Sequence, residues 1–458
     1  MAVSQALSLR ARGAAVLTAI TPEAIVLAAA IPIVFWHVRY QPGTDVRLGS
    51  TTVGIQLSDL AVLAVLVAAV VVGRRLGFGS LRYGRPLWLA VGLFFVWVAL
   101  EIAFRAGSNG YPWQTHSVTA AKFFEYALLA PAVVLIVRRH ADLRLLVGVI
   151  VAWSTVATFV GLLQFFGANL FVSGATGGRQ LSFLGFHDFG ALSAAALAVA
   201  MMTIALPALG LNRRLGWIAA ASGGLGVILS APLAAVIGLG LAAVALLFVA
   251  YRQHELAPRR LAAVAAILAV TSAGAVAMRG DQLDVVLQLV GIETQQQTSA
   301  DVESYAHRSV LAWIGWQIFL DHPLTGVGWE ASGDPSRYMP YVPAARRRFP
   351  NEPDLAFPAA NRSYGVQNLY VQTLADLGAI GFLLLGSVFA VGVSLAARAR
   401  TAFTTIGLLW IAVIAGVWAA LGIVAGIPLD ALTWMAFGLA VTPVTEDSAN
   451  SVRNTSTQ

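Results

Sequence analysis

Side chains suited to group-transfer chemistry gather in and beside one polar stretch of about ninety residues, 279–366, between two apolar segments. Arg308 lies within this stretch, and His322 stands in an Asp-His-Pro turn further along it. His187 and Asp188 open an apolar segment nearer the N-terminus. An arginine guanidinium can donate two parallel hydrogen bonds to two oxygens of one phosphate, and histidine gains or loses a proton near neutral pH. These residue types are suited to displacing a phosphate group with a hydroxyl.

The elements that position these side chains are predicted to be membrane helices. The 458 residues are 58% hydrophobic and 11% charged, with a mean hydropathy of +0.76, whereas about 25% of residues in soluble domains are charged. The sequence predicts an all-α fold, a polytopic bundle of about twelve transmembrane helices with one large extracytoplasmic loop. The basic residues lie in short loops and act as topology signals, so no nucleic-acid partner is expected. The absence of cysteine excludes disulfides, thiolate nucleophiles and cysteine-ligated metals.

Apolar runs of about 17 to 25 residues mark the expected helices. The predicted spans are roughly residues 22–38, 57–73, 86–104, 118–137, 143–166, 188–207, 215–230, 232–250, 260–278, 367–394, 403–424 and 428–443. One long run is divided at Ser230-Ala231-Pro232, because the basic clusters on either side would otherwise fall on opposite faces of the membrane. Pro232 favours a break there.

Arginine positions predict the orientation, because cytoplasmic loops carry the excess of basic residues. The basic connections hold Arg74, Arg75, Arg82 and Arg85; Arg138, Arg139 and Arg144; Arg213 and Arg214; Arg252, Arg259 and Arg260; and Arg398 and Arg400. We expect a multi-pass protein of the bacterial cytoplasmic (inner) membrane, with both termini cytoplasmic and residues 279–366 outside, where no ATP is available. The first span has no small-residue cleavage site and is expected to be a retained anchor.

The chain is predicted to have four regions. They are a membrane bundle of about nine helices at 1–278, the extracytoplasmic loop at 279–366, about three C-terminal membrane helices at 367–445, and a disordered cytoplasmic tail at 446–458. Within the loop, residues 308–319 predict a tryptophan-rich helix at the membrane interface. Residues 334–365 are rich in proline and are expected to be ordered but irregular.

Ionisable side chains inside the predicted spans are functional candidates, because charges are costly in a bilayer. By the expected topology they lie in the outer part of their helices and imply a polar chamber that opens outward. These residues are His37, Glu101, Lys122, Glu125, Asp188 and Asp430. Lys122 and Glu125 are three residues apart on one helical face and are expected to pair, or to form an ion-pair cluster with Glu101.

Two blocks of the sequence form a specific pattern. They are Arg308-x4-Trp313 through Asp321-His322-Pro323-Leu324-x-Gly326-Val327-Gly328, and Gln367-Asn368-Leu369-Tyr370-x-Gln372-x5-Gly378-x2-Gly381. Together they resemble the O-antigen ligase and O-antigen polymerase superfamily. A weaker third block is Arg179 to Gly190. The resemblance extends to the whole topology. It implies a GT-C-like fold and the transfer or polymerisation of glycans carried on undecaprenyl pyrophosphate, without a metal or nucleotide cofactor.

The resemblance also implies roles for single residues. Arg308 and Arg179 are expected to stabilise the negative charge of the departing pyrophosphate. Gln367, Asn368 and Asp188 are expected to bind substrate. The alternatives are that Arg308 reaches lipid phosphate from the interface, and that Arg179 is an ordinary loop charge.

The sequence departs from the family pattern at two positions. Gln367 stands where the family usually has histidine, and Ser230-Ala231 stands where it often has Ser-Arg. Glutamine accepts no proton at neutral pH, so Gln367 cannot act as the general base. It could still orient an acceptor hydroxyl or a sugar.

Three other histidines are candidate catalytic bases. His187, beside Asp188, is preferred. His322 is also explained as a hydrogen-bonded turn residue. His307 precedes Arg308, so on a helix it points about 100° away from it.

The sequence predicts a membrane glycosyltransferase, either a ligase or a repeat-unit polymerase. Its expected partners are an undecaprenyl pyrophosphate-linked glycan donor, a glycan, lipid or protein acceptor, and membrane lipids. The non-enzymatic alternatives are a transporter or inactive relative, and a scaffold for a glycan assembly complex. A transporter predicts broken spans with functional groups near mid-bilayer, and a scaffold predicts that Arg308→Ala leaves the phenotype intact.

Overall fold

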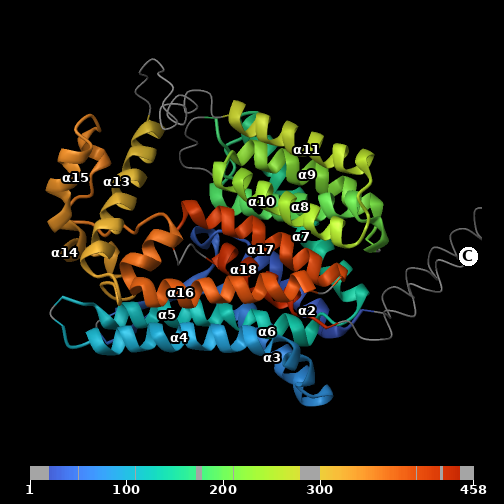
Figure 1. Cartoon of the computed structure of the whole chain (residues 1–458), viewed down its shortest axis with the longest axis horizontal. Coiled ribbons are helices and arrows are strands. Elements are labelled where there is room, and N and C mark those ends of the chain that lie inside the picture. Colours follow the sequence, from blue (N-terminus) through green and yellow to red (C-terminus); the bar gives the residue numbers. More distant parts are fainter. Residues whose placement is uncertain are drawn as a thin grey trace, which may run out of the picture.

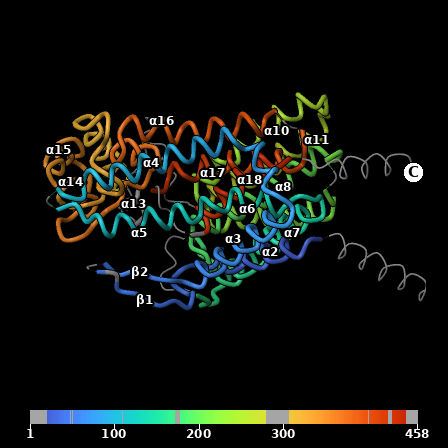
Figure 2. Tube along the Cα trace, turned by 90° about the horizontal axis from the view of Figure 1, so that it is seen from below, coloured from blue at the N-terminus to red at the C-terminus, as the bar shows by residue number. Residues whose placement is uncertain are grey.

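A computed structural model of the chain describes residues 20–49, 51–108, 110–171, 178–209, 211–278, 300–398, 400–422 and 427–443. Within these ranges the molecule is a bundle of long apolar helices with a layer of shorter elements at one end (Figures 1 and 2). A helix satisfies all its interior backbone groups by itself, which is why long apolar runs adopt this form in a bilayer. The predicted all-α class is confirmed.

The bundle and its covering layer contain the following main elements. The bundle helices are α2 (Pro22–Val34), α3 (Leu57–Leu76), α4 (Arg85–Arg105), α5 (Trp113–Ala127), α6 (Leu129–Ile136), α7 (His140–Phe165), α8 (Phe186–Ala205), α9 (Arg213–Ser230), α10 (Leu233–Arg252), α11 (Pro258–Ala277), α16 (Leu369–Arg398), α17 (Ala402–Val417) and α18 (Ile427–Ala440). The covering elements are β1 (Gly43–Leu48), β2 (Thr51–Gln56), α13 (Ala300–Asp321), α14 (Pro335–Tyr338) and α15 (Val342–Arg348).

Nine helical segments in the described part of the chain are long and apolar enough to cross a membrane. A helix lies within every predicted span, but α2 and α18 have only 13 and 14 residues, and α9 is not among the nine. The expected count of about twelve is therefore not confirmed. The predicted division at Ser230-Ala231-Pro232 is present, and Ala231 ends α9 with a left-handed φ of 45°.

Contacts between helix ends define two opposite poles of the bundle. At one, Arg75 forms an ion pair with Glu23 at 3.6 Å, and Arg252 Nη1 donates to the Ala397 carbonyl at 2.6 Å. We call this end the basic pole. The covering layer lies at the other end, the loop pole (Figures 1 and 2). Arg75 and Arg252 thus lie at the end of the bundle away from the long loop, in agreement with the topology expected from the sequence.

A β-hairpin at the loop pole was not predicted from the sequence. Its strands are antiparallel, with Gly43 opposite Gln56 and Leu48 opposite Thr51. It is a small addition to a helical fold, and it packs near the start of α5.

The charged partners inside the bundle differ from those expected. Lys122 Nζ bonds to Asp59 Oδ2 at 3.1 Å, whereas Glu125 was the expected partner. Glu101 accepts from Arg105 Nε at 2.9 Å, four residues along the same helix. Sequence spacing identified the charges but missed Asp59, because a pairing between helices depends on how the helices pack.

The long loop is organised by α13, which crosses the loop pole at a steep angle to the bundle helices (Figure 1). It contains the predicted helix at 308–319 and extends it at both ends. Trp313 contacts Phe349 edge to face, with ring centroids 6.2 Å apart. Residues 334–365 are less irregular than expected, because proline in the first turn starts both α14 and α15.

A break in α16 joins the long loop to the bundle. Gly378 has a φ of 66° and a ψ of −167°, which are not helical. Four backbone hydrogen bonds of 2.8 to 3.3 Å link residues 323–328 to residues 375–380 and satisfy groups that the break would otherwise leave unpaired. Arg105 of α4 supports the same turn, since its Nη2 donates to the Gly326 carbonyl at 2.7 Å. We call this connection the Gly378 joint.

The Gly378 joint explains the glycines of the two sequence blocks. A Cβ atom on Gly378 would lie 2.2 Å from the Leu324 carbonyl oxygen, and one on Gly326 would lie 2.4 Å from the Asp376 carbonyl carbon. Both distances are far below van der Waals contact, and both glycines have positive φ. Gly326 and Gly378 are therefore needed because the backbones of residues 323–328 and 375–380 are in close contact.

Candidate functional site

Two arginines from distant parts of the chain contact neighbouring residues in the first turn of α8. Arg308 of α13 donates from Nη2 to His187 Nε2 at 3.2 Å. The guanidinium of Arg179 lies over the ring of Phe186, 4.2 Å from its centroid. Consecutive residues of one helical turn thus hold both predicted pyrophosphate ligands. We call Arg179, Phe186, His187 and Arg308 the arginine cluster.

The start of α8 depends on a close approach of the chain at Gly185. Gly185 has a φ of 94°, and a Cβ atom there would lie 3.2 Å from His37 Cδ2. His37 is held by its Nδ1, which accepts from the Arg39 N–H at 3.1 Å. Burial, and secondarily Arg39, lower the pKa of His37. The first turn of α8 is therefore placed against a fixed imidazole, with Asp188 on that turn.

The contact between Arg308 and His187 defines what His187 does in this state. Arginine carries only donors, so His187 Nε2 must accept and a neutral ring carries its proton on Nδ1. The lone pair that a general base would use is therefore directed at Arg308. The geometry makes His187 a residue that orients the guanidinium.

Arg179 is held at the point where α9 ends. Its Nε donates to the Ser230 carbonyl at 3.1 Å, one of the backbone groups that a helix leaves unpaired at its C-terminus. The partial negative charge of a helix C-terminus favours a cation there. The Ser230-Ala231 departure from the family pattern is thus a direct neighbour of Arg179.

The start of α16 lies beside the same face of α13 as Arg308. Gly315 is seven residues after Arg308, which places the two on one helical face roughly 10 Å apart. A Cβ atom on Gly315 would lie 3.0 Å from Val366 Cγ2. Gln367, the next residue, is partly exposed. The structure therefore brings Gln367 to the side of α13 that carries Arg308.

Asn368 has a structural role at this position. Its Oδ1 accepts from the Val371 N–H at 3.0 Å, and its Nδ2 donates to the Ala419 carbonyl at 2.9 Å. The first bond caps α16, and the second ties that helix to the turn after α17. Both polar atoms of the amide are thus engaged within the protein.

The structure separates His322 from the arginine cluster. His322 is exposed just beyond the end of α13, about 20 Å along the helix from Arg308. Its neighbour Asp321 accepts from the Tyr341 hydroxyl at 2.7 Å. His307 Nδ1 lies 2.9 Å from the Ala356 carbonyl, so it contributes to loop packing.

A group of polar residues beneath the Gly378 joint was missed. Gln372 Nε2 donates to Glu330 Oε1 at 3.1 Å, and Asp376 Oδ1 accepts from the Ser332 N–H at 2.7 Å. Burial raises the pKa of Glu330 to about 7. Glu330 adopts a left-handed φ of 61°, which is uncommon outside glycine. Its position two residues after the Gly-Val-Gly turn is the signal that could have identified it.

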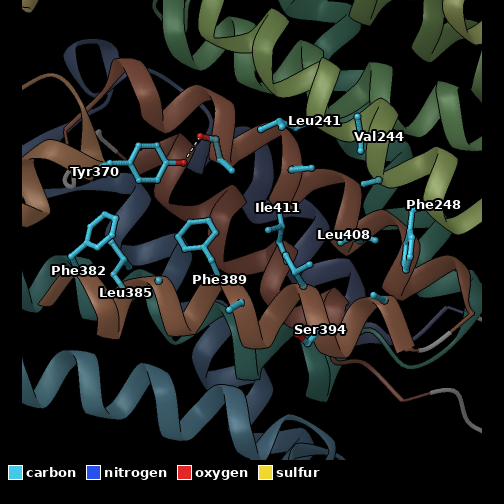
Figure 3. Close-up of a pocket in the computed structure, with 17 residues that line it drawn as sticks. Leu241, Val244, Phe248, Tyr370, Phe382, Leu385, Phe389, Ser394, Leu408 and Ile411 are labelled. Atoms are coloured by element: carbon cyan, nitrogen blue, oxygen red, sulfur yellow. Dashed lines mark hydrogen bonds between the residues drawn. The ribbon is translucent and has the colours of Figure 1, made fainter. Parts of the chain in front are cut away.

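An apolar groove of about 760 Å³ runs along α16 between α10 and α17 (Figure 3). Tyr370 lies at one end, where its hydroxyl donates to the Ala415 carbonyl at 2.6 Å. Leu241, Phe382 and Phe389 are among the lining residues. The groove therefore begins near the start of α16, within one turn of Gln367.

No group of three or more histidine, cysteine or acidic residues within the described ranges is arranged to hold a metal ion. The site consists of guanidinium, imidazole, amide and carboxyl groups. These can bind an anion, orient a hydroxyl and accept a proton.

Comparison with known families matches residues 217–386 to the O-antigen ligase family. No curated protein is significantly similar to the chain. The matched segment contains Arg308, Gln367 and the Gly378 joint, whereas Arg179 and His187 precede it. It confirms the resemblance seen in the sequence and supports a membrane function of the O-antigen ligase or polymerase type. Residues 217–386 are thus similar to the O-antigen ligase family.

Proposed function

We propose that this protein transfers or polymerises a glycan carried on undecaprenyl pyrophosphate, joining it to an acceptor hydroxyl at the outer face of the bacterial cytoplasmic membrane. The contacts of Arg308 and Arg179 with consecutive residues in the first turn of α8 carry the proposal. Two guanidiniums at one helix start suit a pyrophosphate, whose negative charge grows as it leaves the sugar. No metal or nucleotide cofactor takes part.

The remaining residues of the cluster prepare this site. His187 orients Arg308 through the 3.2 Å contact, and Ser230 fixes Arg179 through its carbonyl. Gln367 orients the acceptor hydroxyl or a sugar, and Asp188 accepts a hydrogen bond from a glycan hydroxyl. His322 has no part in this site, since it lies at the far end of α13.

The apolar groove along α16 accommodates the isoprenoid chain of the donor. It starts beside Tyr370, close to the helix start that carries Gln367, and continues toward the basic pole at Ala397. A carrier lying there would keep its chain in an apolar environment with its pyrophosphate at the loop pole.

The orientation of the chain follows from its arginine-bearing connections. The basic pole faces the cytoplasm together with both termini, and the loop pole faces outward. The donor is therefore used where no nucleotide is available, so its own pyrophosphate bond must supply the energy of transfer.

A transporter is the main non-enzymatic alternative, because broken spans are typical of transporters. The break in α16 offers little support for it. Loop backbone closes the Gly378 joint with four hydrogen bonds, so the break anchors the loop and leaves no open gap in the span.

The test is the size profile of lipid-linked and acceptor-linked glycan in a deletion strain complemented with wild type or Arg308→Ala. Long chains left on the carrier, unrelieved by Arg308→Ala, indicate a ligase. Single repeats on the acceptor indicate a polymerase. If neither pool changes, the enzymatic function is wrong, and an intact phenotype with Arg308→Ala supports a scaffold.

A further inference from the structure

Two carboxyl groups, those of Glu330 and Asp376, lie next to the Gly378 joint and interact with the same amide, that of Gln372. Gln372 lies between them, donating to Glu330 at 3.1 Å and interacting with Asp376. Asp376 is 1% exposed and accepts from the Ser332 backbone, so it is fixed in the interior. Glu330 is partly exposed to solvent, so it is the carboxyl group of the two that a substrate can reach.

The backbone at Glu330 is held in an unusual conformation. A left-handed φ in a residue other than glycine costs of order 1 kcal/mol or more and persists only where the surroundings enforce it. Trp329 enforces it on one side, because its carbonyl accepts from the Tyr111 hydroxyl at 3.2 Å. On the other side, the Ser332 N–H donates to Asp376 Oδ1, and this bond also holds the backbone at Glu330 in its conformation. The chain is thus bent to direct the Glu330 side chain toward Gln372.

This carboxyl pair is connected to the arginine cluster through the loop. Tyr364 N–H donates to the Gly333 carbonyl at 3.1 Å, and the Tyr364 ring lies 5.0 Å from that of His307, the neighbour of Arg308. A second connection passes through Gly422, where a Cβ atom would lie 2.6 Å from Gln372 Oε1 and 3.3 Å from the Val366 carbonyl. Glu330 and Arg308 therefore border the same region around the start of α16.

Other candidate bases near this region are engaged. His187 Nε2 accepts from Arg308. His116 Nε2 lies 3.4 Å from Asp334 Oδ2, and the His116 side chain is 7% exposed. Gln367, at the position of the family histidine, accepts no proton at neutral pH.

We propose that Glu330 is the general base that accepts the proton of the acceptor hydroxyl, with Gln372 holding its carboxylate in position. The inference rests on the proposed transfer function and names its missing proton acceptor. The hydroxyl proton passes to Glu330 as the hydroxyl oxygen bonds to the anomeric carbon. The bond from that carbon to the pyrophosphate oxygen breaks, and its electron pair leaves on the pyrophosphate beside Arg308 and Arg179. Glu330 then releases its proton to water.

The ionisation of Glu330 suits this step. Burial is the main cause that raises its pKa to about 7; the bond from Gln372 opposes this rise, and the charge of Asp334 adds a smaller increase. Of the charged groups that face it, Asp334 comes from the same segment and Asp376 from α16. A base is most effective when its pKa lies near the working pH.

The raised pKa also predicts how Glu330 affects folding. A carboxyl whose folded pKa exceeds its unfolded value binds more protons in the folded state, so stability falls as pH rises from about 4.5 to about 7. The glutamine side chain of Glu330→Gln does not ionise, so the variant does not lose stability over this pH range. The variant should therefore melt no lower than wild type at pH 8.

The experiment compares wild type, Glu330→Gln, Gln372→Met and Arg308→Ala in the transfer assay, using full-length protein in nanodiscs with lipid-linked glycan donor and acceptor. Glu352→Gln, from the same loop, is the matched control and should match wild type. We expect Glu330→Gln to lower kcat by about 100-fold or more, with KM within about twofold and Tm unchanged or raised at pH 8. The decline of kcat below about pH 7 in wild type should be absent from its residual activity.

Gln372→Met provides a second measurement that does not require Glu330→Gln to fold. Loss of the amide donor should raise the pKa of Glu330 and move the acidic limb of kcat to higher pH. Activity of Glu330→Gln within threefold of wild type, or an acidic limb that Gln372→Met does not move, would overturn the proposal. If Arg308→Ala is impaired while Glu330→Gln is not, only the role of Glu330 is wrong. If wild type transfers no glycan, the proposed function fails as well.

Discussion

The Gly378 joint and the arginine cluster both bind the long loop to the bundle, but through different kinds of contact. The joint is made of backbone hydrogen bonds between residues 323–328 and 375–380, with glycines packed at distances no side chain could tolerate. The arginine cluster is made of side chains, and its contacts are a 3.2 Å bond from Arg308 to His187 and a stacked guanidinium. A substrate anion could replace the side-chain contacts of the arginine cluster, but not the backbone hydrogen bonds of the joint.

This difference separates residues that define the family from residues suited to its chemistry. The most specific part of the sequence resemblance, from Asp321 to Gly328 and on to Gly378, encodes the joint. The weaker block, Arg179 to Gly190, supplies three of the four residues of the arginine cluster. Changes in the joint should therefore act on folding, and changes in the cluster should act on turnover.

The largest expected effect is on folding, from Gly378→Ala. The new Cβ atom would lie 2.2 Å from the Leu324 carbonyl oxygen at a positive φ, which should cost more than about 3 kcal/mol. Detergent-solubilised protein should melt far below wild type or fail to accumulate. Gly386→Ala is the control, because no atom lies within 4 Å of a Cβ added there. Equal melting of Gly378→Ala and wild type would show that the joint is not tight.

The next effect is on turnover, from His187. If His187 orients Arg308, His187→Ala should lower turnover about 10-fold through misplacement of the guanidinium. His187→Gln offers an oxygen acceptor in place of Nε2 and should stay within about threefold of wild type. Both are measured as initial rates of glycan transfer. A loss of about 100-fold in His187→Gln would make His187 a general base and contradict its orienting role.

Asn368 should affect stability alone. Asn368→Ala removes the cap of α16 and the bond to Ala419, at a cost of about 1 kcal/mol. Its Tm should fall by a few degrees, and its rate per folded molecule should equal that of wild type. Gln367→Ala is the paired variant, expected to change the rate and to leave Tm in place. The reverse pattern would assign substrate binding to Asn368.

The smallest expected effect is that of His322→Ala. The side chain is exposed and lies about 20 Å along α13 from Arg308, so rate and Tm should both stay within experimental error of wild type. A tenfold loss of rate would return His322 to the list of catalytic residues.

Patterns along the chain predicted the elements well, because apolar length and proline positions act locally. The helix at 308–319, the division at Pro232 and the basic loops all follow from such local rules. The β-hairpin was missed because its two six-residue strands lie between two membrane helices, where the sequence predicts a connection.

The site was only partly predictable, because its contacts join segments far apart in sequence. Arg308 and His187 were both identified, but their bond depends on how the fold brings α13 to the first residues of α8. Asn368 was assigned to substrate, although its amide caps a helix. Glu330 was missed because its significance comes from a left-handed backbone and from Gln372, and neither is visible in the sequence.

The most direct test of the account is the rate of glycan transfer from an undecaprenyl pyrophosphate-linked donor by Arg308→Ala in nanodiscs. Arg347→Ala, an exposed arginine of α15, is the control. We predict that Arg308→Ala is slower by about 100- to 1000-fold, the usual cost of removing a preorganised charge donor, with unchanged Tm and with Arg347→Ala unaffected. Transfer by Arg308→Ala within threefold of wild type would contradict the claim that the arginine cluster holds the pyrophosphate.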